Sequence, residues 1–412
     1  MQIDISGVRV AWTNARPGGP LEYGGPVKIL HVVPSYLPAV RYGGPIVSVH
    51  GLCKTLAARG HDVEVFTTNV DGPENSSVPL GVPVDLDGVK VWYFSVPALR
   101  RLYWSPGMSK ALRQHVGSFD VVHTHSVFLW PTWAAARIAR QRNVPYVMAP
   151  RGMLVPELIR RKSRLLKRAW IALVERNNVA KAALIHFTSR IEAEEASALG
   201  MSIRESRVIP NGLDISSMDS GRRKDLPEGV AAGEEPFLLF VGRINWKKGL
   251  DRLIAALPFI PDCKLVIAGN DEERLKPKLE VLAAKAGVRE RISFAGPVYG
   301  EDKAALLSRA LLLVLPSYSE NFGNVVIEAM AAGCPVVVTP EVGAADIVRE
   351  SAAGAVLEGD PATLGAGIRR LISDPVALEC MGAKGREFVR HRYTWEAVCI
   401  QMEDAYRYAI SG

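Results

Sequence analysis

The sequence predicts an α/β protein made of two Rossmann-like domains joined by one linker. Short, almost continuous apolar runs alternate with longer stretches of helical periodicity through nearly the whole chain. This alternation is typical of parallel strands whose sheet is covered by helices on both faces. The alternation restarts after Gly233, and 412 residues are more than one hydrophobic core usually serves.

The first series of elements follows an extension, residues 1–27, that fits neither series and has no assigned role. A strand is expected over 28–34, a helix over 44–60 and a strand over 62–68. Residues 28–210 are therefore predicted to form the N-terminal Rossmann-like domain. Its further strand–helix pairs are expected to begin at Asp120, Pro145 and Ala183.

The second series is set off by residues 211–235, whose Asn-Gly pair, further glycines and charged run are the composition of a linker. Residues 236–390 are predicted to form the C-terminal Rossmann-like domain, with strands in PFLLFVG, KLVIAG, RISFAG, LLLVLPS and PVVVTP. Residues 391–412 are helical by pattern, and this C-terminal helix could cross back to the N-terminal domain.

Composition narrows the class of protein. Hydrophobic residues make up 48% of the chain and charged residues 23%, the balance of an ordinary globular protein. The five cysteines are scattered and form no C-x-x-C pair, which argues against a zinc site or a disulfide framework and favours a reducing cytosol. No secretory signal is visible at 1–7, and no apolar run reaches the roughly 18 residues of a membrane span. A cytoplasmic protein is expected.

The strongest chemical signal lies in the segment PSYSENFGNVVIEAMAAGCPVVVTP. It predicts a strand, a loop that carries Glu320, and a helix over 324–332 that carries Glu328. The backbone amides at the start of this helix suit a phosphate, and a carboxylate one turn later can accept hydrogen bonds from both ribose hydroxyls. The alternative to a binding site is that Glu320 only caps the helix and that Glu328 is a solvated residue on its surface, which is the usual role of such a pair of glutamates.

A second motif, VGRINWKKGLDRLIAAL, places Arg243 and Lys248 in a loop between a strand and a helix. A diphosphate leaving group needs its developing charge neutralised by a metal or by positioned cations. Arginine offers a bidentate fork and lysine a point charge, so both residues suit that task. An ordinary basic loop would show the same residues.

Taken in this order, the motifs resemble the retaining glycosyltransferase family 4. Its enzymes have the GT-B fold, in which two Rossmann-like α/β domains face each other across a cleft, and the resemblance implies the same fold here. The resemblance runs from about Lys28 to the C-terminus and rests on Gly43-Gly44, RGHDVEVFTTN, DVVHTH, IPNGLD, GR…KKG and the E-x7-E with its PVVVTP strand. The PRGML segment resembles that of bacterial enzymes that build cell-surface polysaccharides. The chain departs from the family at 343–346, where Gly-Ala-Ala-Asp replaces a Gly-Gly pair, a change that concerns donor preference rather than fold.

The resemblance implies a nucleotide-sugar donor as substrate, no cofactor and no metal. It implies transfer to an acceptor hydroxyl, saccharide or lipid-linked, with retention at the anomeric carbon. By the same resemblance, Glu328 holds the nucleotide ribose and Glu320 faces the donor-sugar hydroxyls. Arg243 and Lys248 take the diphosphate. Donor binding would further involve Gly43, Gly44, Phe322, Gly323, Asn324 and Val325, and catalysis would involve His125, Arg243, Lys248 and Glu320.

The N-terminal domain offers two further candidates at the carboxyl ends of its strands, where sites in open α/β sheets form. His125 matches the family's sugar-contacting histidine, and the period of two places it on the same face as His123. Two histidines at this spacing could ligate zinc, but no third ligand is identifiable nearby, and buried structural histidines are the alternative. Arg151 could contact the acceptor or the donor, or only form a turn between Pro150 and Gly152.

The segment 157–175 combines helical periodicity with a dense run of cations in a chain of formal net charge +7. Its cations are Arg160, Arg161, Lys162, Arg164, Lys167 and Arg168, and its apolar stripe is Leu158, Leu165, Leu166, Ala169, Trp170, Leu173 and Val174. These features predict either a helix lying on an anionic membrane surface or a helix whose stripe faces the sheet. In a third interpretation the apolar stripe packs against the sheet and only the cations beside it contact lipid headgroups. The protein would then be peripheral on the inner face of the membrane. Phosphorylated substrates and lipid explain the charge, so nucleic acid is not expected as a partner.

Two functions other than glycosyl transfer are compatible with two domains and a nucleotide-sugar site. A nucleotide-sugar 2-epimerase shares the fold and the donor but needs acid/base carboxylates around the sugar ring, where this chain has the E-x7-E arrangement. A non-catalytic nucleotide-sugar binding protein would bind the donor without hydrolysis or transfer, and the intact Arg243, Lys248, Glu320 and Glu328 argue against it. The string Asp85-Leu86-Asp87 fits a D-x-D metal–nucleotide motif, but it precedes Gly88, which favours a hairpin turn. The resemblance therefore implies glycosyl transfer, in bacterial polysaccharide or glycoconjugate synthesis, as the leading function.

Overall fold

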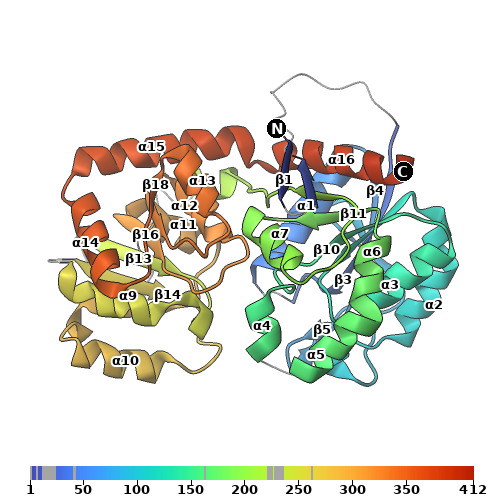
Figure 1. Cartoon of the computed structure of the whole chain (residues 1–412), viewed down its shortest axis with the longest axis horizontal. Coiled ribbons are helices and arrows are strands. Elements are labelled where there is room, and N and C mark those ends of the chain that lie inside the picture. Colours follow the sequence, from blue (N-terminus) through green and yellow to red (C-terminus); the bar gives the residue numbers. More distant parts are fainter. Residues whose placement is uncertain are drawn as a thin grey trace. The chain divides into compact units, whose positions relative to one another are not determined.

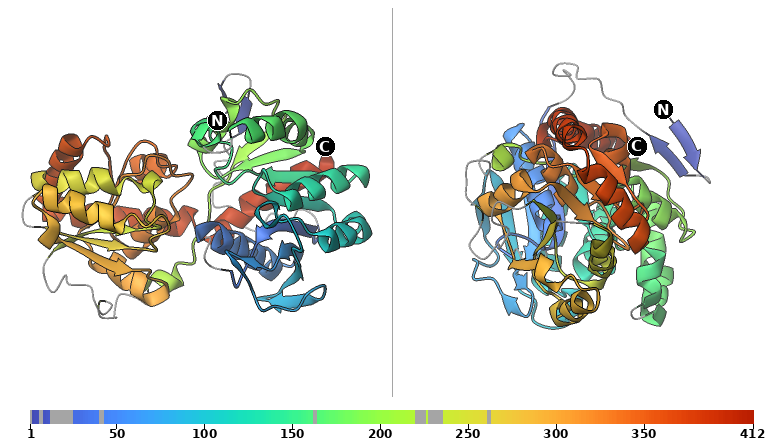
Figure 2. Two further views of the ribbon diagram at one scale, coloured as in Figure 1. Left: turned by 90° about the horizontal axis from the view of Figure 1, so that it is seen from below. Right: turned by 90° about the vertical axis from the view of Figure 1, so that its left-hand side faces the viewer.

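The computed structural model describes residues 2–5, 8–11, 25–39, 43–161, 164–219, 226, 236–260 and 263–412. The chain forms two compact units: the first comprises Met1–Gly212 and Trp395–Gly412, and the second comprises Leu213–Thr394. Each unit is a sheet with helices on both of its faces (Figure 1; Figure 2). The predicted α/β fold class is confirmed. Most of the predicted linker, 211–235, lies outside the described residues.

The first unit is built on a ten-stranded sheet of order β1-β2-β12-β11-β10-β9-β3-β4-β8-β7. Neighbouring strands are parallel except in the hairpins β1–β2 and β7–β8 at its two ends. The strands are β1 (Gln2–Ile5), β2 (Val8–Ala11), β3 (Lys28–Ser35), β4 (Asp62–Thr68), β7 (Pro83–Leu86), β8 (Val89–Phe94), β9 (Val121–His125), β10 (Tyr146–Ala149), β11 (Leu184–Phe187) and β12 (Ser206–Val208). A short ribbon pairs β5 (Val70–Asp71) with β6 (Glu74–Asn75). The extension thus contributes two strands that the sequence did not indicate.

The helices of the first unit cover both faces of this sheet (Figure 1). They are α1 (Gly44–Ala58), α2 (Pro106–His115), α3 (Trp130–Gln141), α4 (Pro156–Arg161), α5 (Arg164–Trp170), a π-helix (Ile171–Glu175), α6 (Arg176–Lys181), α7 (Arg190–Ser197) and α16 (Trp395–Ser411). Ile29 and Val33 of β3 pack with α1 and α16, while Leu30 and Val32 pack on the opposite face with α2 and α3. The alternation follows from the period of two along a strand.

The C-terminal helix α16 belongs to the first unit, although the second unit precedes it in sequence. Glu403 of α16 pairs with Arg59 and with His61, whose Nε2 lies 3.2 Å from its carboxylate. Burial by itself would raise the pKa of Glu403, but the hydrogen bonds from His61 and Arg59 have a larger combined effect and lower this pKa to about 2. This ion pair fixes α16 beside the end of α1.

The second unit has a six-stranded parallel sheet of order β15-β14-β13-β16-β17-β18. Its strands are β13 (Phe237–Val241), β14 (Lys264–Ala268), β15 (Ile292–Gly296), β16 (Leu312–Leu315), β17 (Val336–Val338) and β18 (Gly354–Val356). Its helices are α8 (Ser216–Asp219), α9 (Leu250–Ala256), α10 (Lys276–Lys285), α11 (Gly300–Arg309), α12 (Asn324–Ala332), α13 (Ala345–Ser351), α14 (Pro361–Ile372) and α15 (Pro375–Arg392). The central strands β13 and β16 are buried along their whole length, as their continuous apolar sequences predict.

The string Asp85-Leu86-Asp87 lies in a hairpin, as predicted. Strands β7 and β8 are joined at Asp87 (φ 55°) and Gly88 (φ 81°). Two left-handed residues in a two-residue loop are the hallmark of a type I′ turn. The Asp85 carboxylate accepts a hydrogen bond from the Gly88 amide, so it serves the turn itself.

The apolar stripe predicted over 157–175 does not face the sheet. Leu165, Leu166 and Leu173 are 82%, 69% and 81% exposed, whereas Ile171 and Glu175 are buried. The segment is not one regular helix, because its last five residues form a π-helix whose wider turn rotates the buried face. The two readings that turn the whole stripe inward are therefore wrong. Of the predicted stripe and cations, the side chains of Leu158, Arg161, Lys162 and Arg164 lie outside what the structure describes. Within the described part of the chain, no helix combines the length and apolarity needed to cross a membrane.

Candidate active site

Two loops are bound to each other at the carboxyl edge of the second unit's sheet. One follows β13 and ends at Gly249, and the other follows β16 and begins at Pro316. The amide of Tyr318 donates a hydrogen bond to the carbonyl oxygen of Lys247 at 2.6 Å. Gly249 has φ 64°, and a Cβ there would lie 2.0 Å from the Pro316 carbonyl oxygen, so only glycine allows this approach.

Lys248 and Glu320, one from each loop, form an ion pair in which Lys248 Nζ donates to Glu320 Oε2. Their side chains are only 14% and 19% exposed. The backbone of Glu320 is fixed as well, because its amide donates to the carbonyl oxygen of Glu341 and its carbonyl accepts from the amide of Gly343. The structure thus brings these two predicted residues together as neighbouring ammonium and carboxylate groups.

Glu328 lies in the second turn of α12 and forms an ion pair with Lys303 of α11, in which Nζ and Oε1 are 2.8 Å apart. The two side chains are 16% and 23% exposed. A carboxylate has about four lone-pair positions, so Glu328 retains acceptor capacity beyond this pair. The sequence did not point to Lys303, because a single lysine inside a helical run carries no motif.

Arg243 has a partner of its own. Its Nη1 lies 3.1 and 3.2 Å from the two carboxylate oxygens of Glu272, in the loop after β14, and the side-chain amide of Asn245 donates to the same carboxylate. The side chains of Arg243 and Glu272 are each 44% exposed. Exposed ion pairs contribute only about 0–1 kcal/mol, so an incoming phosphate could replace Glu272 at small cost. Glu272 stands in an acidic run that sequence reasoning passed over.

The first turn of α12 lies beside these loops. Gly323 is the N-cap residue with φ 90°, and no side chain caps this nine-residue helix. An uncapped helix N-terminus attracts an anion, here at the turn formed by Asn324 and Val325. Phe322, the residue before this N-cap, is buried and packs in the core of the unit. The buried hydroxyl of Ser317 has no hydrogen-bond partner among the described residues, as expected of a group that meets a ligand or water.

In the first unit, α1 begins beyond the carboxyl end of β3. Gly43 is its N-cap residue, with φ 72° and ψ −140°, and no side chain caps the helix. Because a Cβ on Gly43 would meet nothing within 4 Å, backbone conformation rather than space requires glycine here. Gly44 is the first helical residue.

His125 ends β9, and Arg151 follows the neighbouring strand β10, so the parallel register brings them together. Arg151 Nε and Nη2 lie 3.3 and 3.2 Å from His125 Nδ1, and Nη1 donates to Asn211 Oδ1 at 2.9 Å. His125 is buried, and Arg151 is half-buried in a left-handed turn of φ 56°. Burial, assisted by the Arg151 charge, lowers the pKa of His125 well below its usual value, so the imidazole is neutral.

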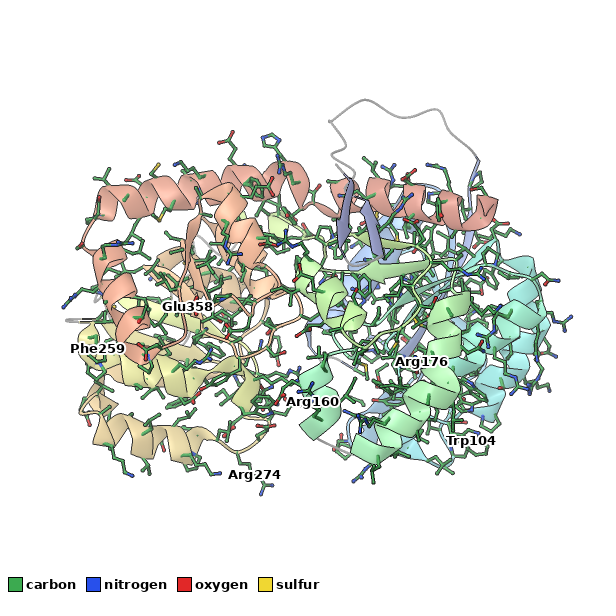
Figure 3. All side chains as sticks on the ribbon, viewed as in Figure 1. Trp104, Arg160, Arg176, Phe259, Arg274 and Glu358 are labelled. Carbon is green, nitrogen blue, oxygen red and sulfur yellow. The ribbon has the colours of Figure 1, made fainter. Side chains whose placement is uncertain are left out.

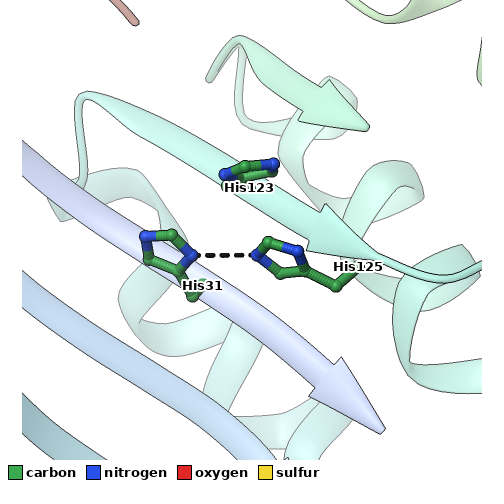
Figure 4. Close-up of side chains that lie close together, drawn as sticks. All are labelled: His31, His123 and His125. Carbon is green, nitrogen blue, oxygen red and sulfur yellow. Dashed lines mark hydrogen bonds between the residues drawn. The ribbon is translucent and has the colours of Figure 1, made fainter. Parts of the chain in front are cut away.

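A third histidine, His31 of β3, lies beside His123 and His125 (Figure 4). The register places His31 opposite His123, and the ligand atoms of all three rings lie within 4.8 Å of one another. The expectation that the sequence offers no third ligand near these histidines is therefore wrong. Neighbouring parallel strands come from distant parts of the chain, and nothing local in the sequence marks His31 as their neighbour.

Comparisons with known proteins point to glycosyltransferases. The family described as "Glycosyl transferases group 1" matches residues 221–388, and "Glycosyl transferase 4-like domain" matches residues 43–212. The chain is 27% identical over 403 residues to an uncharacterized glycosyltransferase of Methanocaldococcus jannaschii, covering 93% of this chain and 99% of that protein. It is 29% identical to the D-inositol 3-phosphate glycosyltransferase of Xylanimonas cellulosilytica, covering 89% and 92%.

Solved structures are similar to the chain as well. Sucrose-phosphate synthase from Thermosynechococcus elongatus has a TM-score of 0.74 at 24% identity, with 93% of this chain and 99% of that one covered. Anabaena HepE in complex with UDP-glucose has a TM-score of 0.70 at 20% identity, with 92% and 99% covered. At this level of identity the two structures support the fold.

Proposed function

Because the chain belongs to the family-4-type glycosyltransferases of GT-B fold, we propose that it moves a sugar from a nucleotide-sugar donor to an acceptor hydroxyl with retention of the anomeric configuration. The observation that carries the proposal is a pair of glutamates at one edge of the second unit, each ion-paired with a lysine: Lys248–Glu320 and Lys303–Glu328. Carboxylates accept hydrogen bonds from sugar hydroxyls, and lysines neutralise phosphates.

Each charged group has a role in this proposal. Glu328 accepts hydrogen bonds from the ribose hydroxyls while Lys303 holds its carboxylate in place. Glu320 faces the hydroxyls of the donor sugar. Lys248 and Arg243 stabilise the charge that develops on the diphosphate as the glycosidic bond breaks, with the N-terminus of α12 as a further anion site.

Retention fits a front-face route, in which the nucleoside diphosphate leaves from the side that the acceptor enters. The leaving phosphate then helps to deprotonate the acceptor hydroxyl, and no covalent nucleophile is needed. Two positioned cations can supply the neutralisation for which other enzymes use a metal ion, so we propose turnover without one. The acceptor is a saccharide or a lipid-linked sugar of bacterial polysaccharide or glycoconjugate synthesis.

Attachment to an anionic membrane surface is part of the proposal. Leu165 and Leu173 present exposed apolar groups on the same segment as Arg168 and Arg160, which is exposed on α4 (Figure 3). Exposed apolar side chains among cations are typical of segments that insert shallowly between lipid headgroups. Each cation near such a surface contributes about 1 kcal/mol to binding. This location suits a lipid-linked acceptor.

A thermal-shift panel of UDP, GDP and ADP tests the donor site. A ligand that binds the native state raises the melting temperature, and we expect one nucleotide to do so in the absence of metal. A panel without any shift would contradict the proposed donor site. Turnover of the matching nucleotide sugar then separates the functions: a transferase releases nucleoside diphosphate faster with an acceptor, an epimerase converts the sugar without one, and a binding protein does neither.

A further inference from the structure

Buried polar side chains form a continuous series on the face of the first sheet that α16 covers. Its first part begins where Arg151 donates to His125 Nδ1. His125 Nε2 lies 2.9 Å from His31 Nδ1, the contact drawn in Figure 4, and the two ring planes are within 8° of each other. The ring centroids are 5.2 Å apart. Nearly parallel rings at that distance can bring two nitrogens to 2.9 Å only if they lie edge to edge in one plane, which is the arrangement that an N–H···N hydrogen bond requires. His31 Nε2 then lies 3.5 Å from the hydroxyl of Tyr406.

The second part leads from Tyr406 to the backbone. The Tyr406 hydroxyl lies 2.8 Å from His123 Nδ1, and His123 Nε2 lies 3.4 Å from His186 Nδ1. His186 Nε2 lies 2.8 Å from the carbonyl oxygen of Ile209. Four histidines and one tyrosine thus connect a guanidinium group to a carbonyl group without a break.

The two ends fix the direction of every hydrogen bond in the series. Arg151 can only donate, and the carbonyl of Ile209 can only accept. A neutral histidine has one donor and one acceptor nitrogen, so each ring must accept at Nδ1 and donate from Nε2. Tyr406 accepts from His31 and donates to His123. Both ends require the same assignment, and each ring nitrogen of the four histidines has one partner residue in the series.

We propose that His31, His123, His186 and Tyr406 are positioning residues that hold His125 as the Nε2–H tautomer, with Nδ1 as its acceptor. The inference rests on the proposed function. Nε2 of His125 points along the sheet to His31, whereas Nδ1 lies beside half-buried Arg151 at the carboxyl edge. A substrate hydroxyl at that edge therefore meets His125 as a hydrogen-bond acceptor, joining or replacing Arg151 as the donor.

Neutral rings are required for this arrangement, because a protonated histidine has two donors and no acceptor. Burial and then the Arg151 charge lower the pKa of His31 to about 3, and the same two causes, in that order, lower that of His186 to about 3. Burial raises the pKa of Tyr406 well above its usual value, so its hydroxyl keeps its proton.

The same geometry argues against a metal ion held by His31, His123 and His125. The lone pair of each ring is already the acceptor of a hydrogen bond: from His125, Tyr406 and Arg151 respectively. A divalent cation would have to displace all three donors and lie beside a guanidinium charge. Zinc binding by these three histidines is the alternative that the experiment below distinguishes from the hydrogen-bonded series.

Long-range ¹H–¹⁵N NMR of histidine rings, in protein labelled with ¹⁵N-histidine, tests the proposal without any substrate. The chain has eight histidines, so assignment by single substitution is practical. We expect His31, His123, His125 and His186 each to carry the proton on Nε2 at pH 7, with one tautomer populated. A proton on Nδ1 of His125, or a mixture of its tautomers, would overturn the proposal. Zinc chloride that shifts the rings of His31, His123 and His125 together in the wild type would overturn it too.

Tyr406→Phe breaks the series at its centre, and Tyr146→Phe is its matched control. Tyr146 is also buried, and its hydroxyl donates to the carbonyl oxygen of Asn178 outside the series. Tyr406→Phe removes the hydrogen bonds of the hydroxyl with His31 and with His123. We expect it to shift the ring signals of both histidines and to lower kcat/KM about fivefold, an effect the size of one neutral hydrogen bond, while Tyr146→Phe does neither. Equal histidine spectra for the two variants would overturn the proposal.

If Tyr406→Phe does not fold, the tautomers measured in the wild type still test the proposal. A correct tautomer pattern in a protein that transfers no sugar would refute the proposed function and leave the series intact.

Discussion

Replacing Glu328 with alanine separates donor binding from stability. The carboxylate is paired with Lys303, and side-chain exposures of 16% and 23% place this pair in partly solvated surroundings. Removing the carboxylate leaves Lys303 without this partner at a mostly buried position, which costs about 1–3 kcal/mol, and alanine is the best helix former. We therefore expect the free energy of unfolding to fall by at most about 3 kcal/mol while the fold survives. Loss of hydrogen bonds from a carboxylate to the ribose hydroxyls should instead cost about 2–3 kcal/mol of transition-state stabilisation, or roughly 30- to 160-fold in kcat/KM.

The assay is release of nucleoside diphosphate from the donor sugar, measured beside a denaturation curve for each variant. Glu280→Ala is the control, because Glu280 forms a comparable pair with Arg289 at 3.0 Å in the same unit. Turnover close to wild type in a well-folded Glu328→Ala protein would refute the assignment of the ribose site. An equal loss in Glu280→Ala would show that disturbance of the unit, not of the donor, is being measured.

Three further predictions follow from the structure. Turnover should persist in excess EDTA, and Lys248→Met should abolish most of it; loss of activity in chelator with rescue by magnesium or manganese would contradict the role given to the cations. Leu173→Ser should weaken co-sedimentation with anionic vesicles, whereas Val376→Ser, at a 77% exposed position of the second unit, should not; equal absence of wild-type binding to anionic and neutral vesicles would contradict membrane attachment. Stability should fall as the pH drops below about 6.5, because His31 and His186, with pKa values of about 3, stay neutral in the folded protein while the unfolded chain takes up protons at the usual pKa of 6.5. Each adds up to about 1.4 kcal/mol per pH unit until the folded pKa is reached, and a free energy of unfolding that is constant from pH 8 to pH 5 would contradict this.

The fold was largely readable from the sequence because its signals are local. Buried parallel strands such as β13 and β16 are continuous apolar runs, and helix ends are marked by residues that adopt positive φ, such as Gly333 at φ 81° after α12. The hairpin at Gly88 was readable for the same reason. The orientation of 164–175 was not, because a π-helix breaks the 3.6-residue period on which a stripe is read.

Residues of the candidate site could be predicted where a motif contains them, but their partners, which only the folded chain brings near, could not. Glu320 and Lys248 stand in recognisable loops, but their pairing depends on two loops that meet only in the folded sheet. Lys303 and Glu272, the partners of Glu328 and Arg243, lie on elements without any motif. His31 and Tyr406 come from β3 and α16, so no spacing in the sequence relates them to His125.

Real-time ¹H NMR of nucleotide sugars mixed with the protein tests donor use and stereochemistry together. UDP-glucose, GDP-mannose and ADP-glucose form the panel, first with water as the acceptor. We predict that the wild type releases nucleoside diphosphate from one of them, that the sugar first appears with the anomeric configuration it had in the donor, and that Glu328→Ala releases far less. Release with the opposite anomer formed first would contradict retention, and no release from any donor, with or without saccharide acceptors, would contradict glycosyl transfer itself.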